Sequence, residues 1–194
     1  GNTRLSVMAG EAASEIAVEV TTSKARILPG INVYAFTADG SYTGKRAVTD
    51  ENGVARFEIS EFADGSYKFR ADYLSCQFWS DNITLPGDVS AGIQIAEESA
   101  AIEVIQAGYP KEGVKVYLFN ASGVYLGRYQ TTGTDGKVDF DLPVGHEFKF
   151  RADILGSQFM SETVEIFLQG SNNYTINSGG GTLAVTVDNG DGSP

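Results

Sequence analysis

An internal repeat of about 82 residues limits the folds that this chain can adopt. Residues 30–36 (GINVYAF) match residues 113–119 (GVKVYLF), and residues 67–72 (YKFRAD) match residues 148–153 (FKFRAD). A third match joins residues 77–80 (QFWS) to residues 158–161 (QFMS). Two segments with the same pattern are expected to fold alike, so the sequence predicts consecutive units of one small fold.

The pattern continues at both ends: residues 5–7 (LSV) precede their strand much as residues 93–95 (IQI) precede theirs, so residues 1–10 are expected to end a preceding copy. Residues 183–187 (LAVTV) repeat residues 16–20 (IAVEV), which indicates a third copy. We therefore expect a fragment of a longer array whose host protein and number of repeats the sequence does not reveal. The predicted domains are the last strand of a preceding repeat at 1–10, one repeat at 11–96, a second at 97–178 and the start of a third at 179–194.

Within each copy, apolar residues alternate with polar ones, as in Ile16, Val18 and Val20. This period of two is typical of half-buried β-strands. Turn sequences such as Ala38-Asp39-Gly40 and Asp50-Glu51-Asn52-Gly53 separate the strands. About seven short strands in 82 residues predict an all-β chain of two tandem Ig-like or prealbumin-like β-sandwich repeats.

One predicted hairpin fixes several side chains. We place a two-residue turn at residues 155–158 (LGSQ), and residues 74–77 (LSCQ) replace it in the first copy. Counting outward from the turn puts Arg151 opposite Glu162 and Arg70 opposite Asp81, two ion pairs expected to stabilise the hairpin. The opposite face of the first-copy hairpin is expected to line the core with Tyr67, Phe69, Ala71, Tyr73 and Phe78.

The order of motifs in the second copy resembles the Cna-B-type and carboxypeptidase-regulatory-like domains, which share a prealbumin-like sandwich. The resemblance is carried by residues 113–119, 132–136 (TGTDG), 138–145 (VDFDLPVG) and 148–152 (FKFRA). It implies stalks of bacterial surface proteins, pilins and large secreted proteins. Some members of such families carry a Lys–Asn/Asp isopeptide bond with the lysine on the first strand. Residues 15–20 and 101–105, the first strands here, contain no lysine.

The net charge and the counts of particular residues further limit the functions expected of this chain. The net charge of −11 argues against nucleic acid as a binding partner, because its phosphates attract basic surfaces. No stretch reaches the roughly 20 apolar residues that span a bilayer, so no membrane insertion is expected. His146 is the only histidine, is expected in a solvated turn and has no counterpart in the first copy, so we expect no enzyme and no catalytic residue. Cys76, the only cysteine, is expected at an exposed hairpin tip.

The best retained polar residues follow the same two predicted strands in each copy. They are Arg70, Asp72 and Gln77 in the first copy, and Arg151, Asp153 and Gln158 in the second. Trp79 and Met160 are expected on the same outer face. One interpretation is a shallow binding strip for a surface glycan or a protein. The alternative, which we favour, is a set of side chains that hold the hairpin or the contact with a neighbouring repeat.

No metal site or cofactor is predicted, because residues 188–192 (DNGDG) lack the alternating oxygen ligands of a calcium loop. Calcium binding at the junctions between repeats is an open alternative, for which the sequence offers no set of ligands. We therefore expect non-enzymatic stalk or spacer repeats of an extracellular or cell-surface protein, with neighbouring repeats of the same chain as partners. An adhesin or carbohydrate-binding module is one alternative. A filament subunit that assembles by strand addition is another.

Overall fold

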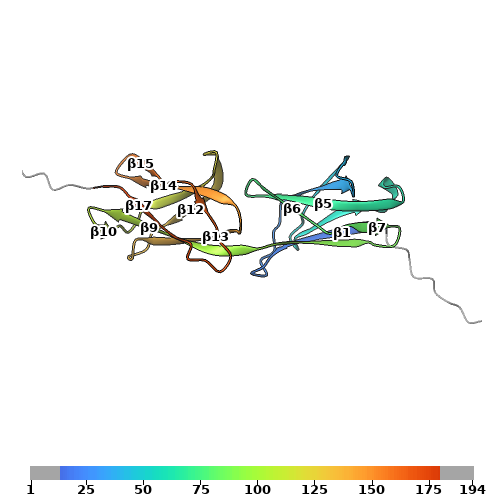
Figure 1. Ribbon diagram of the computed structural model, residues 1–194, viewed down its shortest axis with the longest axis horizontal. Coiled ribbons are helices and arrows are strands. Elements are labelled where there is room, and N and C mark those ends of the chain that lie inside the picture. The colour runs from blue at the N-terminus through green and yellow to red at the C-terminus, as the bar shows by residue number, and fades with distance from the viewer. Residues whose placement is uncertain (1–13, 180–194) are drawn as a thin grey trace, which may run out of the picture. The chain divides into compact units, whose positions relative to one another are not determined.

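The computed structural model describes residues 14–179, which divide into one compact unit ending at Glu97 and a second beginning at Glu98. Figure 1 labels several strands of each unit. The strand predicted at 1–10 lies outside the described residues, and so does the partial repeat predicted at 179–194, apart from Gly179. No described helix is long and apolar enough to cross a membrane.

The first unit is built from short strands and one 3-10 turn, η1 (Ile59–Glu61). The strands are β1 (Glu15–Thr22), β2 (Asn32–Thr37), β3 (Tyr42–Val48), β4 (Val54–Glu58), β5 (Gly65–Tyr73), β6 (Cys76–Trp79), β7 (Ile83–Leu85) and β8 (Ser90–Ile95). They form a three-stranded sheet in the order β4-β1-β8 and a second sheet in the order β3-β2-β5-β6, in which β7 also pairs with β5.

The core of the first unit lies between these two sheets. Alternate residues of β1 are fully buried and meet the inward residues of β5 in one apolar cluster. Phe57 on β4 contacts Phe69 on β5, with ring centroids 5.2 Å apart. The prediction for the hairpin face is confirmed, because Tyr67, Phe69, Ala71 and Tyr73 are buried and Phe78 packs against them.

The second unit repeats this plan. Its strands are β9 (Glu97–Gln106), β10 (Tyr109–Pro110), β11 (Lys115–Asn120), β12 (Tyr125–Thr131), β13 (Lys137–Pro143), β14 (Glu147–Ile154), β15 (Ser157–Met160), β16 (Val164–Glu165) and β17 (Asn173–Asn177). One sheet has the order β10-β9-β13 with β17 also on β9, and the other has the order β12-β11-β14-β15 with β16 also on β14. Phe140, Phe148 and Phe150 fill its interior.

The predicted fold class is confirmed: the chain is all-β, with sheets that pack face to face. Each unit has more strands than the seven expected in each copy. The additional strands are β7, β10 and β16, which are only two or three residues long. Segments this short carry too few residues to show a period of two, so the sequence pattern does not reveal them.

Two features of the strand arrangement shape each unit. The first strand pairs in parallel with the last, β1 with β8 and β9 with β17. The outer strands β3 and β12 carry a bulge opposite β2 and β11, where Gly44 and Gly127 take φ values of +81° and +74°. Such a bulge bends an exposed edge and discourages pairing with another chain.

Candidate functional site

The polar residues singled out in the sequence lie together on the outer face of one sheet in each unit. In the first unit, Arg70 on β5 is opposite Trp79 on β6, and Asp72 is opposite Gln77. In the second unit, the register places Arg151 opposite Met160 and Asp153 opposite Gln158. Each set therefore forms one continuous strip across two neighbouring strands.

The predicted ion pairs across the hairpin are wrong by two residues. Arg70 faces Trp79 and not Asp81, and Arg151 faces Met160 and not Glu162. The turn is centred one residue earlier than expected, so that Tyr73 pairs with Cys76 and Ile154 with Ser157. The sequence match to a Gly-X turn was misleading, because the structure uses two residues with positive φ in each hairpin.

Each arginine instead pairs with the aspartate two residues along its own strand. Arg70 Nε donates to Asp72 Oδ1 at 2.8 Å and Arg70 Nη2 to Asp72 Oδ2 at 3.0 Å. Arg151 makes the same two hydrogen bonds to Asp153, at 2.8 and 3.0 Å. Residues two apart point to the same face of a strand, so the forked guanidinium and the carboxylate meet side by side.

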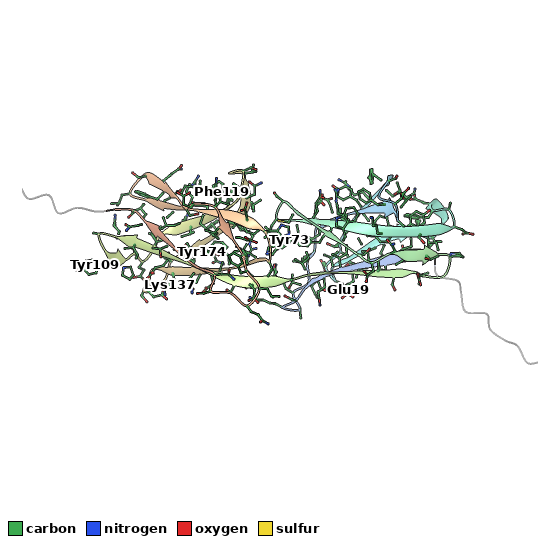
Figure 2. The ribbon with its side chains drawn as sticks, viewed as in Figure 1. Glu19, Tyr73, Tyr109, Phe119, Lys137 and Tyr174 are labelled. Atoms are coloured by element: carbon green, nitrogen blue, oxygen red, sulfur yellow. The ribbon has the colours of Figure 1, made fainter. Side chains whose placement is uncertain are left out.

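Aromatic rings surround each guanidinium group. The Arg70 guanidinium carbon lies 4.9 Å from the ring centroid of Tyr34 and 5.3 Å from that of Phe36. The Arg151 guanidinium carbon lies 4.8 Å from Tyr117 and 5.3 Å from Phe119, which Figure 2 labels. These distances allow cation–π attraction. The same arrangement is thus built twice.

We call these rings the aromatic clusters. The cluster of the first unit comprises Tyr34, Phe36, Tyr42 and Trp79, and that of the second unit comprises Tyr117, Phe119, Tyr125 and Tyr129. Several members are open to water: Tyr42 is 51% exposed, Trp79 43% and Tyr129 53%. An exposed group of large rings is a common sign of a contact surface.

A hollow of about 290 Å³ lies in the first cluster, lined by Tyr34, Phe36, Tyr42 and Arg70. Its walls are ring faces and a guanidinium group that Asp72 already neutralises. Such a hollow suits a mainly apolar or weakly polar group, whereas an anion would compete with Asp72. The groups that it offers to a ligand are ring faces, tyrosine hydroxyls and a paired guanidinium.

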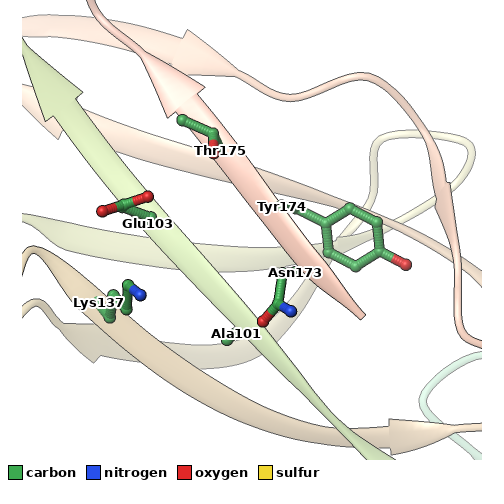
Figure 3. A pocket seen from close by; sticks show the side chains of 6 residues that line it. All are labelled: Ala101, Glu103, Lys137, Asn173, Tyr174 and Thr175. Carbon is green, nitrogen blue, oxygen red and sulfur yellow. The ribbon is translucent and has the colours of Figure 1, made fainter. Parts of the chain in front are cut away.

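A second hollow, also about 290 Å³, lies on the first-and-last-strand sheet of the second unit (Figure 3). It is lined by Ala101 and Glu103 on β9, Lys137 on β13, and Asn173, Tyr174 and Thr175 on β17. Lys137 and Asn173 are exposed, so water reaches the charged and amide groups of this hollow. We assign no chemistry to this set.

Within residues 14–179, no three His, Cys, Asp or Glu side chains lie close enough to hold a metal ion. His146 is half-buried, and burial lowers the pKa of its imidazole. Cys76 is half-buried rather than exposed as expected, because it begins β6 beside the core, and burial raises the pKa of its thiol to about 11.

Sequence reasoning missed two groups that the structure brings out. Thr49 is buried, donates to Leu28 O at 2.6 Å and accepts from the Ile31 amide at 2.8 Å. Thr132 does the same with Lys111 O at 2.7 Å and the Val114 amide at 2.9 Å. The signal was a threonine before a turn in both copies. The aromatic clusters were also missed, although Tyr34 and Phe36 recur as Tyr117 and Phe119.

Comparisons with known proteins find similar solved structures only. No family model and no curated protein matches the chain. The Bacillus anthracis TIE protein matches with a TM-score of 0.38 and 15% identity, over 87% of this chain and 33% of its own. The chain thus spans about a third of that protein. SpaA, a shaft pilin from Lactobacillus rhamnosus GG, matches with a TM-score of 0.38 and 11% identity, over 89% of this chain and 99% of its own.

GBS52, a minor pilin of Streptococcus agalactiae, matches with a TM-score of 0.42 and 10% identity, over 91% of this chain and 99% of its own. Matches at these TM-scores carry no argument about function. The function of this chain must therefore be inferred from its own residues and strand pairing.

Proposed function

We propose that this chain is a non-enzymatic part of a larger extracellular or cell-surface protein, in which tandem β-sandwich repeats act as a stalk or spacer. One observation carries the proposal: within each unit, the first and last strands are parallel neighbours. The chain therefore enters at one end of the sheet and leaves at the other. Each unit advances the chain by at least the length of a six-residue strand, about 20 Å.

The charge and residue inventory support the same proposal. The chain has 25 acidic against 14 basic residues, which keeps copies of an extended protein apart in solution. The retained Arg70–Asp72 and Arg151–Asp153 pairs lie on strands and not on loops, as expected of groups that stabilise the sheet. The partners of each repeat would then be its neighbours in the same chain.

Small-angle X-ray scattering of the 194-residue chain tests the spacer. A stiff, extended particle in calcium and in chelator is the expected result. Independent tumbling of the two units, or a compact particle, would contradict a spacer. Stiffening in calcium alone would identify a calcium-dependent spacer and a cation site, a possibility for which the sequence offered no ligand set.

The exposed aromatic clusters favour a second candidate, a binding module for a surface glycan or a protein. The strip formed by Arg70, Asp72, Gln77 and Trp79 would bind beside the hollow of the first unit. Arg151, Asp153 and Gln158 would form the corresponding binding strip of the second unit. A glycan array probed with the intact chain tests this candidate. Binding that Trp79→Ala abolishes, while the fold persists by circular dichroism, would replace the spacer as the main function.

The filament alternative depends on strands predicted at residues 1–10 and 182–187, outside the described part of the chain. Sedimentation at increasing protein concentration tests it. Growth of the particle with concentration would support strand addition, and a constant sedimentation coefficient would oppose it.

A further inference from the structure

The pairing of the first and last strands of the first unit has a definite direction. β1 and β8 run parallel with six residues in register, from Ala17 opposite Ser90 to Thr22 opposite Ile95. Backbone hydrogen bonds continue the ladder at both ends, from the Ala17 amide to Val89 O at 3.0 Å and from the Ser23 amide to Ile95 O at 2.8 Å.

The second unit has the same ladder. β9 and β17 are parallel from Ala101 opposite Asn173 to Ile105 opposite Asn177. Backbone bonds again extend the pairing, from the Ala101 amide to Asn172 O and from the Ala107 amide to Gly179 O, at 2.9 and 2.8 Å. In each unit the strand by which the chain enters is therefore bonded to the strand by which it leaves.

This geometry decides how tension acts on a unit. A force along the chain pulls β1 toward its amino end and β8 toward its carboxyl end, so the two strands must slide past each other. Sliding strains every hydrogen bond of the ladder together, whereas strands pulled apart from one end lose their bonds one by one. A ladder that breaks all at once resists a larger force than one that opens bond by bond.

The inner face of the ladder strengthens this arrangement. Val18 and Val20 on β1, and Ile93 and Ile95 on β8, are at most 2% exposed. Sliding by one residue would turn these side chains from the core to the solvent face, because side chains alternate along a strand. The register is thus held by apolar packing in addition to the backbone bonds.

We propose that the parallel pairing of β1 with β8, and of β9 with β17, is a shear clamp that carries tension along the chain. The inference rests on the proposed spacer function and adds to it a specific mechanical role. Rupture under force follows the rate of unfolding and not the equilibrium stability. The clamp therefore predicts that resistance depends on the direction of pulling.

In single-molecule force spectroscopy, the direction of pulling can be changed while the strand pairing of the clamp stays the same. Two variants of the full chain carry handles on cysteine pairs, in a Cys76→Ser background. Ser14→Cys with Ala96→Cys pulls from opposite ends of the ladder and shears it. Ser14→Cys with Val89→Cys pulls from one end of the ladder and unzips it. All three positions are at the surface.

The expected result is a several-fold higher rupture force for the Ser14/Ala96 pair than for the Ser14/Val89 pair at one loading rate. Equal forces in both directions would overturn the clamp. Urea unfolding of both variants, followed by the fluorescence of Trp79, checks that their equilibrium stability is the same.

A proline variant locates the resistance. The carbonyl groups of Val89 and Ile95 both face β1. Because the backbone groups of a strand alternate in direction, the N–H of Ala91 faces β1 as well, whereas the N–H of Gln94 points away from it. Ala91→Pro should lower the shear force, and Gln94→Pro should leave it unchanged. Scattering that contradicts the spacer would leave a directional force difference standing, so the two ideas fail separately.

Discussion

Arg26 and Glu97 form an ion pair in the first unit between residues 71 positions apart in the sequence. Arg26 Nη2 donates to Glu97 Oε1 at 2.5 Å and to the Tyr73 hydroxyl at 2.8 Å. The Glu97 side chain is fully buried, whereas that of Arg26 is 39% exposed. The second carboxylate oxygen, Glu97 Oε2, receives no hydrogen bond in the described part of the chain. A pair with such unequal burial should respond unequally to the loss of either partner.

We expect Arg26→Ala to destabilise the first unit more than Glu97→Gln. Removing Arg26 leaves a buried carboxylate unpaired, at a cost of about 3 kcal/mol. Glu97→Gln leaves a partly hydrated arginine and one weaker hydrogen bond, at a cost of about 1 kcal/mol. Urea unfolding followed by the fluorescence of Trp79, the only tryptophan, measures the first unit selectively. Equal losses for the two variants would refute this account of the pair.

The hydroxyl groups of the two buried threonines before the turns, Thr49 and Thr132, should stabilise their units. Thr132→Val keeps the shape of the side chain but removes the bonds to Lys111 O and from the Val114 amide. The amide and the carbonyl then lose a partner inside the unit, which should cost about 1–3 kcal/mol. Thr49→Val should cost a similar amount in the first unit. Thr131→Val, at an exposed position, is the control and should change stability little.

The hairpin turn of the first unit should be improved by glycine. Leu74 and Ser75 have φ values of +50° and +62°, in the left-handed region that non-glycine residues rarely adopt. In the second unit, Gly156 occupies the position of Ser75. Ser75→Gly should therefore stabilise the first unit by about 0.5–1 kcal/mol, measured as an increase in the urea midpoint. Gly156→Ser should lower the stability of the second unit; a gain there would contradict the argument.

The Cys76 thiol should react slowly with alkylating reagents. Burial raises its pKa to about 11, so little of it is thiolate at neutral pH. Compared with a free cysteine at pH 8, alkylation of the folded chain should be roughly 100-fold slower. Urea should restore the ordinary rate. Because the pKa is higher in the folded state, the first unit should lose stability as the pH rises from about 9 to 11. Cys76→Ser should lack this loss.

Alternation of apolar residues was sufficient to predict the β class and much of the core. Ile16, Val18 and Val20 are buried because a strand places every second side chain on one face. The repeat also predicted that the two copies fold alike, and the distances from Arg70 and Arg151 to the rings around them agree within 0.1 Å. These properties depend on local periodicity, which the sequence records directly.

The remaining contacts depend on tertiary structure. The register of the β5–β6 hairpin differs by two residues from the predicted one. The reason is that the turn uses Leu74 and Ser75 in a conformation that their side chains do not favour. The pair Arg26–Glu97 joins residues 71 positions apart, and no local pattern marks such a contact. The parallel pairing of β1 with β8 likewise depends on how the strands in between fold back. The sequence determined which residues are buried, and the path of the chain determined which of them meet.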